Sequence, residues 1–372
     1  MQNVYYALSI HSKRKATVTS TSNSNLLILN FSMDSKHPAL SHQISTVNSL
    51  SPYFEEIVVL TGQHQGEMLA ENVYTYNTNW REGQNLRNLF RFYREVRRIF
   101  RDHKPEVIFS HMNEVFTFLI LPFARLKRIP VCLWYAHTNK SLFLRLIYPF
   151  VDSVLTSTGG SCPYAGKKVT PIGQSIDFQK FYRQEKKISL KNLVHVGRLD
   201  PSKDIANIIR TFIKVESKFP GLSLTFIGVP STNKSEMYLQ KLKDHISDNV
   251  KSDKIKFIGA VSRLELPEVL AKFDLFIHSY VGSLDKAILE ATSVGLPVVT
   301  INQEFINEFG NWSQANPIEL EDELTSCLNL PLNQLEVELK RRQSIVQSAH
   351  SSEAWLLKVS HHLKHLSKDN NW

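Results

Sequence analysis

Short apolar runs alternate with helix-length amphipathic segments along most of this chain of 372 residues. In the first half, the runs typical of buried strands are Leu26–Asn30, Glu56–Leu60, Val107–Phe109, Val131–Trp134 and Val154–Thr156. In the second half they are Leu193–Val196, Leu222–Ile227, Ile255–Ile258, Leu275–Ile277 and Pro297–Ile301. Because helical crossovers join parallel neighbours, this alternation predicts an α/β architecture in which helices cover both faces of parallel sheets.

The alternation pauses at the polar stretch Asp177–Lys187, which we interpret as an interdomain linker. The sequence therefore predicts two tandem Rossmann-like, doubly wound domains, over residues 25–180 and 188–350. Residues 1–24 are predicted to be a disordered leader, because Ser, Thr and Asn dominate their second half. The helical residues 351–372 are expected either to pad the second domain or to pack back on the first. Ligands of such sheets lie beyond the carboxyl ends of the strands, so we expect a site in the cleft between the domains.

The composition indicates the cellular compartment and the charge of the binding partners. Cys132, Cys162 and Cys327 are odd in number and widely spaced, which indicates neither a disulfide framework nor a zinc site and favours a reducing, cytoplasmic location. The longest apolar run, Val115–Ala124, is shorter than the about 20 residues of a spanning helix. The formal net charge of +9 suits a nucleotide, a nucleic acid or an anionic membrane as partner.

The stretch from His195 to Asp204 (HVGRLDPSKD) carries the first candidate chemistry. A strand ends there, a glycine allows a sharp turn, and a helix is predicted to begin at about Asp204. Arg198 and Lys203 flank this turn, and two cations beside a helix N-terminus can neutralise a diphosphate. The alternative is a solvated turn in which Asp200 or Ser202 caps the helix.

A second candidate stretch runs from Ser279 to Thr300. A strand ends, a Gly282–Ser283 turn follows, and a helix is predicted from near Leu284 to Gly295. Glu290 lies in the interior of that helix, where a carboxylate could accept hydrogen bonds from the two hydroxyls of a ribose. The alternative is an ordinary exposed helix glutamate.

These two stretches resemble the family-4 retaining glycosyltransferases, which have the GT-B fold. The family pattern is a Gly-Arg-Leu turn with a downstream Lys, then a Glu–(seven residues)–Glu helix followed by Gly-x-Pro-Val-Val. The resemblance is specific over about residues 190–301 and also includes the segments Thr225–Gly228, Lys256–Gly259, Leu266–Leu270 and Asp274–Ser279.

The resemblance implies a role for each matching position. Arg198 and Lys203 would hold the donor diphosphate, Glu290 would bind the ribose, and the turn at Gly282–Lys286 would cradle the donor sugar and distal phosphate through backbone N–H groups. The implied donor-binding set is Gly197, Arg198, Lys203, Gly228, Gly282, Ser283, Leu284, Asp285, Lys286 and Glu290, and the implied catalytic set is His137, Arg198 and Lys203. One departure is Gly282, which stands where the family has the first Glu of its pair, with Asp285 or Lys286 as a compensating group.

The first half carries fewer signals. His137 follows a predicted buried strand at a place where the family has a histidine near the transferred sugar; the alternative is a histidine satisfied by its neighbours. His111 also follows a strand and is a weaker candidate. Pro171–Asp177 resembles the segment that closes the first domain, with Ser175 where Gly is usual. Ser32–Pro38 replaces the family's Gly-Gly loop and is expected to shape the acceptor pocket.

The implied activity is transfer of a sugar from a nucleotide-diphosphate sugar to a saccharide or lipid-linked acceptor, with retention of configuration, in polysaccharide or glycolipid biosynthesis. We expect no metal and no cofactor beyond the donor, since the sequence shows no Asp-x-Asp pair and the cations can stabilise the departing diphosphate. Two alternatives remain: a sugar-nucleotide epimerase or phosphorylase on the same fold, and a scaffold that has lost turnover. We expect no nucleic-acid partner, because no recognised binding motif accompanies the charge.

A basic amphipathic helix is predicted over Asn85–Lys104. Its apolar stripe is Leu86, Leu89, Phe90, Tyr93, Val96 and Phe100, and arginines crowd the rest: Arg87, Arg91, Arg94, Arg97, Arg98 and Arg101. Ser141–Val154 adds further apolar residues around Arg145. These segments are interpreted either as core stripes with charged outer faces or as a docking face for an anionic membrane, which would make the protein peripheral on its inner surface.

Overall fold

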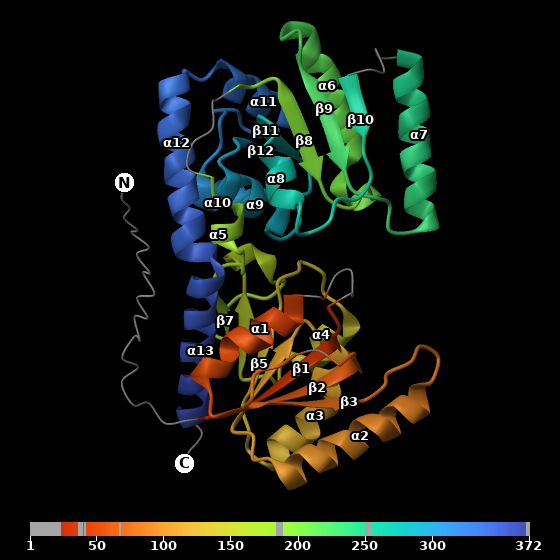
Figure 1. Ribbon diagram of the computed structural model, residues 1–372, viewed down its shortest axis with the longest axis vertical. Coiled ribbons are helices and arrows are strands. Elements are labelled where there is room, and N and C mark those ends of the chain that lie inside the picture. Colours follow the sequence, from red (N-terminus) through yellow and green to blue (C-terminus); the bar gives the residue numbers. More distant parts are fainter. Residues whose placement is uncertain are drawn as a thin grey trace, which may run out of the picture.

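The computed structural model describes residues 24–35, 40, 42–66, 68–183, 189–249 and 254–369. It contains two fully parallel sheets with helices on both faces, so the predicted α/β architecture of two doubly wound units is confirmed. Figure 1 shows the two units one above the other, with the helices of the C-terminal part along one side of both.

The first sheet has seven strands in the order β3-β2-β1-β4-β5-β6-β7. Its strands are β1 (Asn25–Met33), β2 (Glu56–His64), β3 (Val73–Asn77), β4 (Val107–His111), β5 (Val131–Trp134), β6 (Ser153–Thr156) and β7 (Val169–Pro171). The helices along this part of the chain are α1 (His42–Leu50), α2 (Asn85–Asp102), α3 (Glu114–Leu126), α4 (Leu142–Ile147) and α5 (Phe178–Phe181), and short 3-10 turns lie at Ser51–Tyr53 and Gly159–Ser161.

The second sheet has five strands in the order β10-β9-β8-β11-β12. Its strands are β8 (Asn192–Val196), β9 (Ser223–Ile227), β10 (Ile255–Phe257), β11 (Leu275–His278) and β12 (Val298–Thr300). The helices of this part are α6 (Ile205–Lys218), α7 (Asn233–Asn249), α8 (Leu266–Leu270), α9 (Lys286–Val294), α10 (Gln303–Phe309), α11 (Leu320–Asn329), α12 (Leu332–Ile345) and α13 (Ser352–Asp369), with a 3-10 turn at Pro201–Lys203 and one turn of π-helix at Val346–His350.

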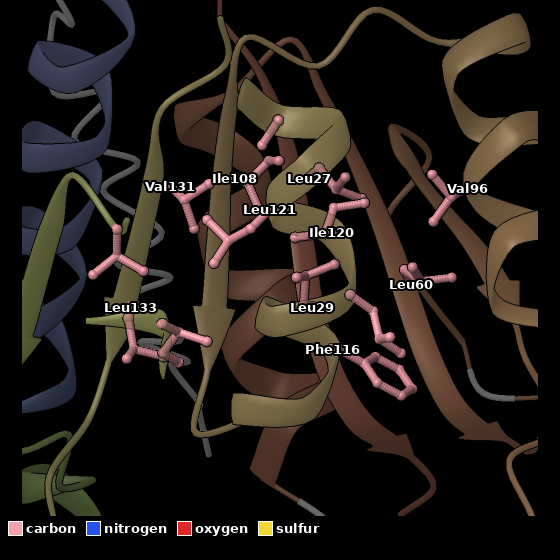
Figure 2. Packing of buried hydrophobic residues seen from close by; sticks show 14 of the residues in the cluster. Leu27, Leu29, Leu60, Val96, Ile108, Phe116, Ile120, Leu121, Val131 and Leu133 are labelled. Atoms are coloured by element: carbon pink, nitrogen blue, oxygen red, sulfur yellow. The ribbon is translucent and has the colours of Figure 1, made fainter. Parts of the chain in front are cut away.

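Alternation along β1 decides which helices cover the first sheet. Leu27 and Leu29 face one side and pack with α2 and α3, as Figure 2 shows for the labelled members of that cluster. Leu26 and Ile28 face the other side, where they join a cluster with α1 and α13. Successive side chains of a strand point to opposite faces, so a continuous apolar run is what a sheet covered on both sides requires.

The last helix returns to the first sheet. Ile176 and Ser351 form a β-bridge where the chain crosses between the two units. Beyond this bridge Trp355 is 1% exposed, with its ring 5.4 Å from that of Trp134 and 6.4 Å from that of Phe109. The C-terminal part of the chain therefore completes the core of the N-terminal part.

The core-facing side of α2 differs from the predicted stripe. Phe92, Val96 and Ile99 are buried, whereas Leu86 is 83% exposed and Phe90 is 69% exposed. The reason is that Phe92, Val96 and Ile99 lie at positions i, i+4 and i+7, which define the face that meets the sheet. Leu86 and Phe90 lie more than about 100° round the helix from this face, so the interpretation as a core stripe is wrong for these two residues.

Candidate functional site

A cleft of about 670 Å³ lies between the two units and gathers most of the candidate residues. His137 and Thr138 line it from the first unit, and Arg198 and Lys203 line it from the second. The turn before α9 completes the wall with Gly282, Ser283, Leu284, Asp285 and Lys286. Residues that follow β5, β8 and β11 therefore converge, as expected for the carboxyl ends of parallel strands.

Lys203 is the more deeply placed of the two predicted cations. It ends the 3-10 turn that precedes α6, and α6 begins at Ile205, next to its predicted start. Its ammonium donates to Asp285 and lies 4.0 Å from the centre of the Tyr280 ring, with 12% of the side chain exposed. Burial alone would raise the pKa of Asp285, but the imidazole of His278 and the charge of Lys203 hold that pKa well below its usual range.

Arg198 is placed differently. Its guanidinium is 3.1 Å from Asp200 and 64% of its side chain is exposed. Asp200 is itself buried and accepts hydrogen bonds from the N–H and the hydroxyl of Ser231. These bonds lower the pKa of Asp200 against the opposing effect of burial. Arg198 therefore reaches the cleft as a solvated cation, whereas Lys203 is held in its wall.

The turn before α9 is fixed from below by Asn302. The Asn302 amide donates to the carbonyls of Tyr280 (2.9 Å) and Gly282 (3.0 Å). A Cβ at position 282 would overlap the Tyr280 hydroxyl, so the tyrosine occupies the space that a side chain there would need. The N–H of Leu284 donates to the Ser161 hydroxyl at 3.0 Å. Among the N–H groups expected to cradle a phosphate, the one of Leu284 is therefore already used.

Glu290 is buried one turn into α9, at 1% exposure, and Arg263 covers it. The guanidinium donates to both carboxylate oxygens, and Nη1 reaches Oε2 at 3.0 Å. Burial raises the pKa of Glu290, and the charge of Arg263 opposes that shift only in part. Both oxygens that were expected to accept ribose hydroxyls are thus paired, and Arg263 is 61% exposed.

Lys286 connects this cleft with a second one of about 770 Å³. The second cleft lies between α1, α5 and α13 and contains Arg263, Lys180 and Glu353 in its lining. Burial lowers the pKa of Lys286, and Glu290 on the next turn of α9 opposes this. Two adjoining spaces lined by cations can accommodate a ligand that has more than one anionic or hydroxyl-bearing part.

Gly197 and Gly228 support the site from behind, outside the lining of the cleft. A Cβ on Gly228 would overlap the Gly197 carbonyl oxygen, and Gly228 has a φ of +140°. The N–H of Gly228 donates to Gly259 at 2.7 Å, and that of Gly197 donates to Ile227 at 3.0 Å. Only glycine allows this close approach of two backbones, which holds the Arg198 turn against the end of β9.

The two histidines of the first unit have different surroundings. His137 is exposed, and the N–H of Asn139 donates to its Nδ1 at 2.9 Å, which leaves Nε2 for a ligand. His111 lies outside the lining of the cleft, 2.7 Å from the Gln43 amide and stacked on Trp134. Burial lowers the pKa of His111 well below its usual value. His111 therefore has the contacts of a structural histidine.

Part of the predicted acceptor loop, Ser32–Pro38, lies outside the described residues, as do residues 1–23 of the leader and part of the linker. In the described part of the chain, no group of three or more His, Cys, Asp or Glu side chains is arranged to hold a metal ion. None of the described helices combines the length and the apolar character that a membrane span requires.

Sequence reasoning missed several residues of the site. Tyr280 and Gln174 line the cleft, and the Gln174 amide donates to the Leu284 carbonyl across the two units at 3.1 Å. Arg263 follows β10 in a stretch without a recognisable motif. The available signal for Tyr280 was its position directly after β11, since that edge of the sheet also carries Arg198 and Lys203.

Comparison with solved structures shows the same fold in several proteins. A glycosyltransferase from Rickettsia africae is 10% identical over 94% of this chain and 100% of its own, with a TM-score of 0.73. Anabaena HepE in complex with UDP-glucose is 14% identical over 92% of this chain and 99% of its own, with a TM-score of 0.68. The lipopolysaccharide outer core galactosyltransferase WaaB is 8% identical over 92% and 99%, with a TM-score of 0.65. The expected two-domain GT-B arrangement is therefore confirmed.

At the level of sequence, no curated protein matches the chain. Residues 177–331, which include Arg198, Lys203 and the turn before α9, match the model of a family described as glycosyl transferases group 1. The sequence match is therefore confined to the second unit, and the fold of both units is that of the glycosyltransferase structures above.

Proposed function

We propose that this protein transfers a sugar from a nucleotide-diphosphate sugar to an acceptor. The observation that carries the proposal is the convergence of Arg198, Lys203 and the turn before α9 on one interdomain cleft that also contains His137. The diphosphate would lie between the two cations and the N-terminus of α9, where helix N–H groups and positive side chains favour an anion. The family match of residues 177–331 supports the same activity.

In the reaction, the bond between the anomeric carbon and the leaving phosphate oxygen breaks and a bond to an acceptor hydroxyl oxygen forms. The diphosphate leaves with the electron pair of the broken bond. Lys203 and Arg198 stabilise the charge that develops on it, which is a task for preorganised cations in a site partly shielded from water. The acceptor proton passes to an oxygen of the departing phosphate. His137 Nε2 would donate a hydrogen bond to a hydroxyl of the transferred sugar.

We extend the proposal to retention of the anomeric configuration and to a reaction without a metal ion. The resemblance of the two motif stretches to the family-4 enzymes supports retention. The cations in the cleft wall and the N-terminus of α9 support the second point, because they supply positive charge where a metal would otherwise supply it. Product anomers resolved by NMR test the first, and turnover in a chelator tests the second.

The decisive experiment is a two-step assay of the purified chain. A thermal-shift screen with UDP, GDP, ADP and their sugar conjugates identifies the donor, because a ligand of the native state raises the melting temperature by mass action. Release of the nucleoside diphosphate is then followed with and without candidate acceptors. Binding with neither transfer nor hydrolysis would establish the inactive scaffold, and a recovered donor with an altered sugar would establish the epimerase.

A membrane-borne acceptor is favoured by one surface beside the cleft. Five exposed apolar residues form what we call the α3–α4 face: Phe118, Leu142, Phe143, Leu146 and Phe150. Their exposed fractions run from 38% to 71%, and the Phe118 and Phe143 rings meet at 5.8 Å. Helix α4 begins five residues after His137 along the chain, so Leu142 and Phe143 belong to the segment that leaves the cleft. WaaB, which has the same fold, is named a lipopolysaccharide outer core galactosyltransferase.

We propose that the α3–α4 face docks on an anionic lipid surface and that the product is a cell-surface polysaccharide or glycolipid. Flotation with vesicles that contain phosphatidylglycerol tests the docking. A Phe143→Ser/Leu146→Ser variant should lose flotation, whereas Leu332→Ser, at a more exposed apolar position on α12, should keep it. Equal flotation of both variants would refute the docking face and would leave the proposed sugar transfer untouched.

A further inference from the structure

A chain of polar side chains runs through the second unit beneath the cleft and ends at Lys203. It begins at Thr300, the last residue of β12, and continues through His278, the last residue of β11. The Thr300 hydroxyl lies 3.0 Å from His278 Nδ1. His278 Nε2 lies 3.5 Å from Asp285 Oδ2, an electrostatic contact longer than a hydrogen bond, and it has no hydrogen-bond partner among the described residues. Asp285 then accepts from the Lys203 ammonium.

The charge of Asp285 favours one tautomer of His278, and the Thr300 hydroxyl can pair with that tautomer. The N–H of Asn302 donates to the Thr300 oxygen at 3.0 Å, and the Thr300 hydroxyl can donate its own proton to His278 Nδ1. This leaves the imidazole proton on Nε2, which faces the Asp285 carboxylate. The other tautomer would direct a lone pair at a negative charge. Thr300 and His278 are 1% and 0% exposed, and burial lowers the pKa of His278 against the opposing effect of Asp285.

Asp285 connects this chain to the ligand side. One of its oxygens accepts from the N–H of Ala287 as the cap of α9, and the other receives Lys203. Lys203 is also confined by the Tyr280 ring at 4.0 Å. A lysine side chain has many rotamers in water, and fixing it before a ligand arrives removes that cost from binding.

We propose that Thr300 and His278 are positioning residues, which fix the Asp285 carboxylate and thereby hold the Lys203 ammonium in place for a diphosphate. This inference rests on the proposed function, in which Lys203 binds the donor diphosphate. Neither Thr300 nor His278 lines the cleft, and His278 reaches it through Asp285. Thr300 also accepts the N–H of Asn302, so His278→Phe is the variant that isolates the route through Asp285.

The first experiment measures the tautomer of His278 in the intact chain, without any nucleotide. Nitrogen chemical shifts from histidine-labelled protein should show a neutral His278 with its proton on Nε2. In Thr300→Val, which keeps the shape and removes the hydroxyl, the His278 signals should shift, and in Thr300→Ser they should return toward the wild-type values. A wild-type proton on Nδ1 would overturn the proposal.

The second experiment measures affinity for UDP and GDP by titration calorimetry. Thr300→Val and His278→Phe should weaken the preferred nucleotide about five- to tenfold, and Thr300→Ser should restore most of the loss. Thr292→Val is the matched control, because it removes a hydroxyl that is equally buried in α9 and bonds only the Ile288 carbonyl. In a Lys203→Met background, His278→Phe should cost nothing further.

The outcomes separate this proposal from the proposed function. Wild-type affinity in Thr300→Val and His278→Phe would overturn the positioning role. The same loss in the presence and absence of Lys203 would also overturn it, because the effect would then not pass through that lysine. A wild-type protein that has the expected tautomer but binds neither nucleotide would refute the donor site instead.

Discussion

Lys203 offers the sharpest test of the site, because two cations of the same predicted role have different surroundings. The Lys203 side chain is 12% exposed and the Arg198 side chain is 64% exposed. Two unit charges about 4 Å apart interact by about 1 kcal/mol in water and by about 4 kcal/mol at an effective dielectric constant of about 20. The half-buried surroundings of Lys203 are closer to the lower dielectric constant, and the exposed surroundings of Arg198 are closer to water.

The magnitude for Lys203→Met follows from this difference. A hydrogen bond to a charged group contributes about 1.5–3 kcal/mol net, which corresponds to an increase in Kd of about 10- to 150-fold for the nucleoside diphosphate. The unpaired Asp285 carboxylate would add repulsion, so we expect the upper half of that range. For Arg198→Met, solvent screening and the pairing with Asp200 limit the loss to about 1 kcal/mol, or about fivefold.

The assay needs a variant that keeps the fold. Lys203→Met alone leaves Asp285 without its partner, and breaking such a pair destabilises a protein beyond the value of the pair itself. We therefore pair it with Lys203→Met/Asp285→Asn, which removes both charges, and measure Kd by calorimetry and unfolding by urea for each. If the double variant binds the nucleotide as tightly as the wild type, or if Arg198→Met loses more affinity than Lys203→Met, the assignment of Lys203 is refuted.

Three further outcomes follow from particular contacts. Trp355→Ala should lower the free energy of unfolding by about 3–5 kcal/mol in urea melts, while Leu357→Ala, on the exposed side of α13, changes it by less than about 0.5 kcal/mol. Gly282→Ala should cost about 1–3 kcal/mol, and most of that cost should disappear in Gly282→Ala/Tyr280→Ala, because the tyrosine hydroxyl occupies the space. Burial lowers the pKa of His195 to about 3. In urea melts below pH 6.5, the free energy of unfolding of the wild type should therefore fall by about 1.4 kcal/mol per pH unit, and His195→Leu should not show this part of the fall.

The sign of the His195 effect follows from proton binding. The unfolded chain takes up a proton near the ordinary histidine pKa of about 6.5, whereas the folded chain resists it until about pH 3. The stabilising contribution is therefore complete above pH 6.5 and falls between pH 6.5 and 3. Identical pH slopes for the wild type and His195→Leu would contradict this reasoning. Equal losses of stability in Trp355→Ala and Leu357→Ala would contradict the role of Trp355. Equal losses in the single and double Gly282 variants would contradict the overlap with Tyr280.

The apolar runs of the sequence predicted the strands that are buried on both faces and missed two others. Strand β3 (Val73–Asn77) has one buried residue. None of the three residues of β7 (Val169–Pro171) is fully buried. Both are edge strands of the first sheet, where only part of the side chains meets the core. An edge strand therefore lacks the continuous apolar run by which a central strand is found.

For the site, spacing along the chain placed the two turns correctly at the ends of β8 and β11, because parallel strands bring their carboxyl ends to one edge. It did not reveal that Arg263 covers Glu290 or that His278 lies next to Asp285. A histidine at the end of an apolar strand reads as a core residue, and an arginine after a strand reads as a solvated one. Pairings between distant residues depend on how the elements pack, which no local pattern contains.

The return of α13 to the first sheet has a consequence for synthesis on the ribosome. Trp355, Val359 and Leu363 cover one face of a sheet whose last strand ends at Pro171. At about 5–20 residues per second, roughly 10–40 s pass between translation of that strand and of Trp355. During this interval, of the described helices, only α1 covers that face of the nascent first unit, so we expect the exposed part to favour binding by chaperones that hold nascent chains.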